Sequence, residues 1–155
     1  MSKKTIWITG GSTGIGKALA IKFASKGWNV AISARRAELL NELSNSYENI
    51  SGFPLDVTDK EKCKEVFNEI KNKYENIDIC FFSTGTWDPK KEKDIDVEQM
   101  EDVFKVNFFG TVNSIKAVEQ YFRDKKNGII TIVSSIAGYR AVSYTHLTLP
   151  TTHDV

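Results

Sequence analysis

Residues 9–16 read TGGSTGIG, and this stretch decides the fold class because it joins an apolar segment to a helical one through glycines. Residues 4–9 end in it as a short strand-like run, and residues 14–25 continue from it with helical periodicity. Missing β-carbons let a phosphate approach the backbone, and the first N–H groups of a helix point toward it. The pattern predicts a strand–turn–helix anion site, with these candidate contacts: Gly10, Ser12, Thr13, Gly14, Ile15 and Gly16.

The rest of the chain alternates in the same way between short apolar runs and longer helical patterns. Further strands are predicted at 29–34, 51–55, 77–83 and 128–134, and helices at 37–46, 59–74, 97–108 and 110–122. This order is typical of an α/β fold whose parallel strands are buried on both faces by helices. Spacing predicts that Ile15, Leu19 and Phe23 form the packed side of the first helix, and that Val112, Ile115, Val118 and Phe122 form that of the last.

Composition narrows the function classes. The chain has 155 residues, 21 Lys and Arg against 20 Asp and Glu, and a net charge of +1. One domain is expected, and no basic excess indicates nucleic acid or an anionic membrane surface as partner. Neither a signal peptide nor a membrane span is recognisable, which predicts a cytoplasmic protein with a small-molecule partner. Cys63 and Cys80 have no CxxC spacing, so they are predicted as core residues rather than as a metal or disulfide site.

The glycine turn has a rival interpretation. Residues 11–17 read GSTGIGK, which matches the G-x-x-x-x-G-K part of a phosphate-binding P-loop. The next residue is Ala18, where an NTPase needs Ser or Thr to hold magnesium. The missing hydroxyl weighs against a phosphotransferase, and no metal site is predicted.

The end of the second strand favours one dinucleotide over another. An acidic residue there would bind a ribose 2′-hydroxyl, but the strand ends in Ala34-Arg35-Arg36. Arginine guanidinium groups suit a 2′-phosphate. Arg35 and Arg36 therefore predict NADP(H) rather than NAD(H), although two exposed arginines at the start of a helix can also be ordinary surface.

Taken together, these motifs resemble the classical short-chain dehydrogenase/reductases over residues 4–141. The turn at 9–16 matches the family's TGxxxGIG, and Leu55-Asp56-Val57 matches the segment whose Asp holds the adenine amino group. Ser83-Thr84-Gly85 stands where the family usually has the end of NNAG, and only the glycine is kept. The resemblance implies a Rossmann-type doubly wound sheet, here ending after a fifth strand, and adds these cofactor contacts: Asp56, Val57, Ser83, Thr84 and Gly85.

The same resemblance supplies candidate catalytic residues. Asn107 lies in a stretch similar to the family's N-V-x-G, whose Asn organises a proton-relay water. Ser135 lies in residues 132–138, IVSSIAG, which resemble the family's I-x-S-S-x-A-G, and its hydroxyl would donate to a substrate carbonyl while hydride arrives. A Ser nucleophile is the rival interpretation of Ser135, but the G-x-S-x-G turn of hydrolases is missing.

Residues 142–151, VSYTHLTLPT, break the resemblance. The family pattern would place a catalytic Tyr at position 148 and a Lys at 152, where this chain has Thr148 and Thr152. The ten residues match the translation of a common transposase-based sequencing adapter. We therefore expect residues 1–141 to be an incomplete NADP(H)-binding domain, residues 142–155 to be non-native adapter read-through, and the natural gene to continue beyond Ala141.

These interpretations lead to one expected function and one alternative. The parent protein is expected to be an NADP(H)-dependent oxidoreductase that interconverts a carbonyl and an alcohol, and the printed chain is expected to be inactive. The alternative is an NADP(H)-binding sensor without chemistry, since the chain keeps the glycine turn but has no Tyr-x-x-x-Lys pair. The family also often pairs through its long central helices, here residues 110–122, which implies a homo-oligomer.

Overall fold

The computed structural model describes residues 3–87 and 96–135. The boundary expected at Ala141 and the adapter-like segment 142–155 lie outside the described residues.

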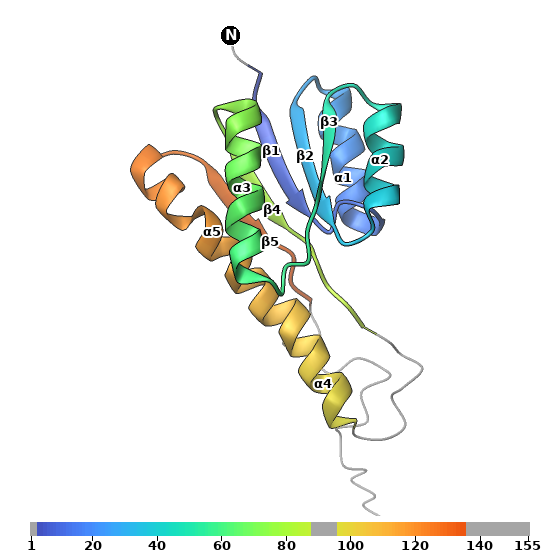
Figure 1. Cartoon of the computed structure of the whole chain (residues 1–155). Helices are drawn as coiled ribbons and strands as arrows, with labels where there is room; N and C mark the ends of the chain where they lie inside the picture. Colours follow the sequence, from blue (N-terminus) through green and yellow to red (C-terminus); the bar gives the residue numbers. More distant parts are fainter. Residues whose placement is uncertain (1–2, 88–95, 136–155) are drawn as a thin grey trace, which may run out of the picture.

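Five parallel strands form one sheet with a reversal in its order (Figure 1). They are β1 (Thr5–Thr9), β2 (Asn29–Ala34), β3 (Ile50–Pro54), β4 (Ile79–Phe82) and β5 (Ile129–Ile132), in the order β3-β2-β1-β4-β5. The chain first adds strands on one side of β1 and then crosses to the other side with β4. The predicted doubly wound α/β sheet is confirmed, and such sheets bind ligands where the order reverses.

Helices cover both faces of the sheet, as Figure 1 shows. The helices α1 (Gly14–Ser25) and α2 (Ala37–Ser46) pack on one face, and α3 (Lys60–Tyr74) and α5 (Gly110–Lys125) pack on the other. Strand side chains alternate between the faces. In β1, Ile6 and Ile8 join the apolar cluster under α1 and α2, while Trp7 joins the cluster under α3 and α5. The Trp7 ring lies 5.6 Å from that of Phe67.

The prediction for the packed side of α1 is confirmed for Leu19 and Phe23, which are partly buried against the apolar cluster, and is wrong for Ile15. The buried residues of α1 are Gly16, Ala20 and Ala24, whereas Ile15 is 63% exposed. The cause is the short distance between helix and turn, since a β-carbon at Gly16 would lie 2.3 Å from the Gly10 carbonyl oxygen. Periodicity of large apolar residues cannot reveal a face that must be small.

The two helices predicted at 97–108 and 110–122 are one continuous helical stretch. The helix α4 (Val97–Phe104) runs through a π-helical turn, η2 (Lys105–Phe109), into α5. Gly110 keeps helical angles of φ −60° and ψ −40°, so it does not end a helix. Its role is close packing, because a β-carbon there would lie 2.4 Å from Val57 Cγ2. Gly110, Ser114 and Val118 form the buried side of α5, and the predicted Val112 is exposed.

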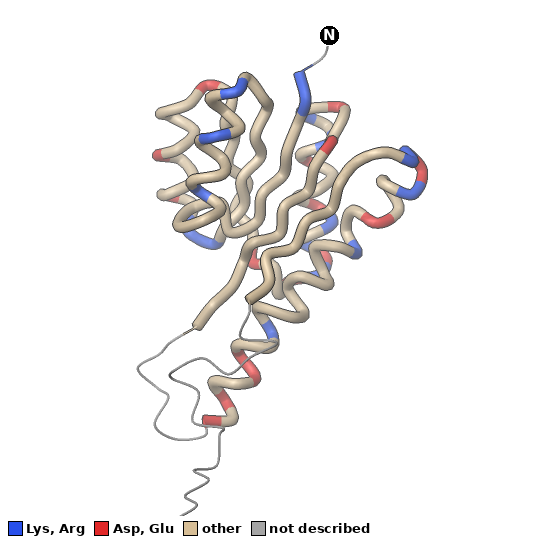
Figure 2. Tube along the Cα trace, turned by 180° about the vertical axis from the view of Figure 1, so that it is seen from behind, with Lys and Arg blue, Asp and Glu red and all other residues tan. Residues whose placement is uncertain are grey.

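The expectation of strands buried on both faces fails for β5. Its residues Ile129 and Ile132 are 56% and 49% exposed, whereas every residue of β1 is buried. Acidic and basic residues alternate over the helices and leave the strands largely uncharged (Figure 2). Within the described ranges, no helix combines the length and apolar character that a membrane span requires.

Candidate functional site

A cavity of about 850 Å³ opens beyond the carboxyl ends of β1, β2, β3 and β4. Every residue that the sequence predicted as a cofactor contact lines this cavity: Gly10, Ser12, Thr13, Gly14, Ile15, Gly16, Arg35, Arg36, Asp56, Val57, Ser83, Thr84 and Gly85. Ala34, Leu55, Thr86 and Val106 complete the lining. The fold thus collects four separate segments at the point where the sheet order reverses, and their roles toward a ligand stay predictions.

The first turn of α1 presents backbone donors to the cavity. Thr13 precedes the helix with extended angles, and its side chain makes no capping hydrogen bond. The first hydrogen bond of the helix runs from the Lys17 N–H to the Thr13 carbonyl oxygen, at 3.1 Å. The earlier N–H groups of a helix have no partner within it, and they carry the positive end of the helix dipole. A β-carbon at Gly14 would meet no atom within 4 Å, so this end is open to an anion.

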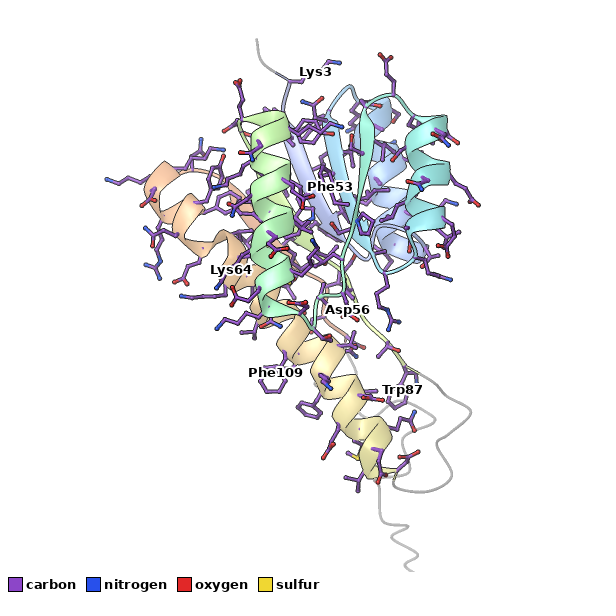
Figure 3. The ribbon with its side chains drawn as sticks, viewed as in Figure 1. Lys3, Phe53, Asp56, Lys64, Trp87 and Phe109 are labelled. Atoms are coloured by element: carbon purple, nitrogen blue, oxygen red, sulfur yellow. The ribbon has the colours of Figure 1, made fainter. Side chains whose placement is uncertain are left out.

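Charged side chains border the other end of the cavity. Arg35 and Arg36 follow β2, and Asp56, which is labelled in Figure 3, follows β3. Partial burial raises the pKa of Asp56, but hydrogen bonds from Thr58 and the charges of Arg35 and Lys105 outweigh it, so the pKa is lowered overall. Asp56 is therefore a carboxylate at neutral pH, able to accept a hydrogen bond beside two cations.

Ser83 braces β4 against β1. Its hydroxyl donates to the Thr9 carbonyl oxygen at 2.7 Å, and its N–H donates to the same oxygen at 3.3 Å. This pair shows how the fourth strand is held although only the glycine of the usual NNAG is present. The brace sits directly under the glycine turn.

Asn107 fastens the loop after β4 to the long helix. Its Oδ1 accepts from the Thr86 N–H at 2.7 Å, and its Nδ2 donates to the Thr86 carbonyl oxygen at 2.9 Å. Asn107 lies within η2, and π turns occur often at functional sites. Its side chain is adjacent to the cavity lining at Thr86 and Val106 rather than part of it.

Ser135 is exposed and lies just past the end of β5. Parallel pairing with β4 continues to the Val133 N–H, which donates to the Phe82 carbonyl oxygen at 2.9 Å. If that register continued, Ser135 would lie beside Gly85. Ser135 does not line the cavity, so the structure assembles the binding half of the predicted site more fully than the reacting half.

Sequence reasoning missed four lining residues and one supporting residue. Each of the four lining residues directly precedes or follows a predicted position, so adjacency was their only signal: Ala34, Leu55, Thr86 and Val106. Asn113 donates from Nδ2 to the Val57 carbonyl oxygen at 3.0 Å. Asn is a weak helix former, and its place inside a helical pattern was the one hint of a specific contact.

Comparisons with known proteins place this architecture in a family. The family model described as short chain dehydrogenase matches residues 4–147. An uncharacterized oxidoreductase of Listeria monocytogenes is 32% identical over 145 residues, covering 91% of this chain and 58% of that protein. Dehydrogenase/reductase SDR family member 7 of Mus musculus is 30% identical, covering 92% of this chain and 45% of that protein.

Solved structures agree with the sequence relatives. ElxO with NADP bound superposes with a TM-score of 0.84 at 31% identity, covering 92% of this chain and 59% of that one. A short-chain dehydrogenase from Streptomyces avermitilis gives 0.83 at 27% identity, covering 91% of this chain and 52% of that one. This chain thus spans between 45% and 59% of the length of these relatives. Its fold, its glycine turn and the match over residues 4–147 show that it belongs to the short-chain dehydrogenase family.

Proposed function

We propose that this chain is the NADP(H)-binding part of an oxidoreductase that interconverts a carbonyl and an alcohol on a small molecule. The observation that carries the proposal is the single cavity that gathers the glycine turn, two arginines and Asp56. ElxO, with the same fold, has been solved with NADP and with NADPH. The bound dinucleotide would supply or accept the hydride.

Each group around the cavity has a distinct binding role. The open N-terminus of α1 suits the pyrophosphate, because its N–H groups and dipole favour negative charge. The guanidinium groups of Arg35 and Arg36 suit the 2′-phosphate. The ionised Asp56 carboxylate suits the adenine amino group. Of these groups, only the two arginines favour NADP(H) over NAD(H), because the pyrophosphate and the adenine are common to both cofactors.

Catalysis would involve two residues outside the cavity lining, Ser135 and Asn107. Ser135 would donate a hydrogen bond to the substrate carbonyl and stabilise the charge that develops there. Asn107 would hold the loop at Thr86 and support proton relay. The whole protein would work as a cytoplasmic homo-oligomer, with exposed Phe104 and Phe108 on the long helix available for pairing.

The 155-residue chain itself is proposed to bind NADP(H) without turnover. It has Thr148 and Thr152 where the family pattern requires a Tyr to transfer the proton and a Lys to lower that Tyr pKa. The same observation supports the alternative of a binding sensor without chemistry. The two differ in whether the natural gene continues past Ala141 to a Tyr and a Lys.

The test combines binding with sequencing. The chain is titrated with NADPH, NADH and ATP with magnesium, and we expect saturable binding of NADPH with weaker NADH and ATP. The source DNA is then sequenced across the Ala141 codon without transposase adapters, and the full reading frame is assayed for NADPH oxidation with aldehydes and ketones. Binding of ATP in place of NADPH would refute the proposal, and a frame that stops after Val155 would leave only the sensor.

A further inference from the structure

The turn that carries Asp56 is stabilised locally by Thr58. Both hydrogen bonds from Thr58, from its N–H at 2.9 Å and its hydroxyl at 2.8 Å, go to Asp56 Oδ1. Within the described part of the chain, Oδ2 has no hydrogen-bond partner. The local turn thus orients the carboxylate and leaves one oxygen for a ligand, but it does not attach the turn to the rest of the protein.

Asn113, on α5, makes that attachment. Its Nδ2 donates to the Val57 carbonyl oxygen at 3.0 Å and lies 3.4 Å from the Thr58 carbonyl oxygen. Asn113 is partly buried, and Val57 is buried against Gly110 of the same helix, where any β-carbon would collide with Val57 Cγ2. One side-chain amide and one glycine therefore fix the position of the turn relative to α5.

The same helical stretch holds the opposite side of the cavity. Asn107 binds both backbone groups of Thr86, and Asn113 binds the turn after β3. The π turn η2 covers Lys105–Phe109 and therefore contains Asn107 but not Asn113. A π turn holds an extra residue, so it rotates the side chains before it relative to those after it. Asn107 and Asn113 thus attach two loops from different strands to one continuous helical stretch.

We propose that Asn113 is a positioning residue for the adenosine end of the cofactor, acting through the Val57 and Thr58 carbonyls on the Asp56 carboxylate. This inference rests on the proposed NADP(H) binding. With the amide in place, the turn is held where Asp56 and Arg35 line the same cavity, and Thr58 occupies only Oδ1 of the carboxylate. Without it, the turn keeps the buried side chains of Leu55 and Val57 and the Cys63 thiol contact on the Val57 carbonyl, but it loses its side-chain hydrogen bond to α5, and the adenosine end loses affinity.

The test uses the whole chain and two probes, NADPH and adenosine 2′,5′-bisphosphate, which carries the adenine and the 2′-phosphate but no nicotinamide. Asn113→Leu keeps the number of side-chain heavy atoms and their branching at Cγ and removes the donor. We expect this variant to bind the bisphosphate about tenfold more weakly, which is the effect of losing one hydrogen bond of ordinary strength. Gln120→Leu is the matched control, since Gln120 lies on the same helix and its amide donates to Asp124 at 2.8 Å; its affinities should stay unchanged.

A second variant separates positioning from a general loss of structure. In Asn113→Asp, the new side chain is a carboxylate at about pH 8, and it repels the two carbonyl oxygens. At lower pH the carboxyl group is protonated and can donate a hydrogen bond to one of them. Its bisphosphate affinity, divided by that of the wild type at the same pH, should recover as the pH falls toward about 5, whereas the ratio for Asn113→Leu should stay flat. Thermal unfolding of each ligand-free variant is measured alongside.

The outcomes are distinct. If the wild type binds neither probe, the proposed function fails and this inference fails with it. If the wild type binds both probes and Asn113→Leu binds the bisphosphate equally well, only the inference is overturned. A weakened Asn113→Leu together with no pH recovery in Asn113→Asp would also overturn it, because the loss would then not depend on a donor at this position.

Discussion

The strands β1 and β5 are both apolar and both lead into predicted site residues, but they differ in burial. Every residue of β1 is buried between helices on two faces, and β1 leads into the glycine turn that lines the cavity. Most of β5 is exposed, and it leads to Ser135, which does not line the cavity. The comparison teaches that the binding half of this site rests on packed elements, whereas the reacting half lies at an exposed edge.

The largest expected effect tests that difference directly. Ile8→Ala in β1 should lower the free energy of unfolding by about 3 kcal/mol, because it leaves a cavity under α1 and α2. Ile130→Ala in β5, where the side chain is 38% exposed, should cost less than about 1 kcal/mol. Urea unfolding of both variants measures the two losses. Equal losses would mean that β5 is as well covered in solution as β1.

A smaller effect separates binding from reaction. Arg35→Ala should lower the affinity for NADPH by about 10- to 100-fold and leave the affinity for NADH nearly unchanged, because a charged hydrogen bond to the 2′-phosphate is lost. Ser135→Ala should leave both affinities within about twofold of the wild type. Fluorescence titration with each cofactor gives the constants. A comparable loss of NADPH affinity in Ser135→Ala would place Ser135 in the binding half.

The smallest expected effect is the pH dependence of stability that comes from Cys63, a buried residue of the cluster under α3 and α5. Burial raises the pKa of the Cys63 thiol from 9.0 to about 11, so the folded chain disfavours the thiolate. The stability from the neutral thiol is therefore complete below pH 9.0 and is lost as the pH rises through about 11. Between about pH 8 and 10 we expect a loss of about 1 kcal/mol in the wild type from this group.

Chemical unfolding at the two pH values measures this loss, and Cys63→Ala is its control. The variant starts from lower stability because it removes buried volume, but its loss between the two pH values should be smaller. Cys80, buried in β4, also has a raised thiol pKa, so part of the pH dependence should remain in Cys63→Ala. An unchanged slope in the variant would mean that the Cys63 thiolate reaches solvent.

Much of this molecule could be predicted from local pattern. The bounds of α1 and α2 and of β2 agree with the sequence prediction, because glycine turns, a helix start and β-branched runs are local signals. The cofactor contacts also came from motifs, and parallel strands necessarily bring their carboxyl ends to one edge. Their role toward a ligand awaits the binding tests.

The features that sequence patterns did not predict depend on contacts between segments that are distant in the chain. The buried side of α1 is made of Gly16, Ala20 and Ala24 because the turn passes so close to the helix. Gly110 was predicted to begin a separate helix, but it lies within a continuous helical stretch and serves as a contact surface for Val57. Asn113 has no motif, since its partners are carbonyl oxygens more than fifty residues earlier in the chain.

The sequence by itself determined the order of strands and helices, the family resemblance and the residues that meet at the cavity, because each depends on short-range chemistry and spacing. Only the tertiary structure decided which helix faces are buried, that α4, η2 and α5 run together, and that Asn107 and Asn113 fasten two loops to that helix. The physical reason is that burial and hydrogen-bond partners are properties of pairs of segments. A residue's own neighbours in the chain do not contain that information.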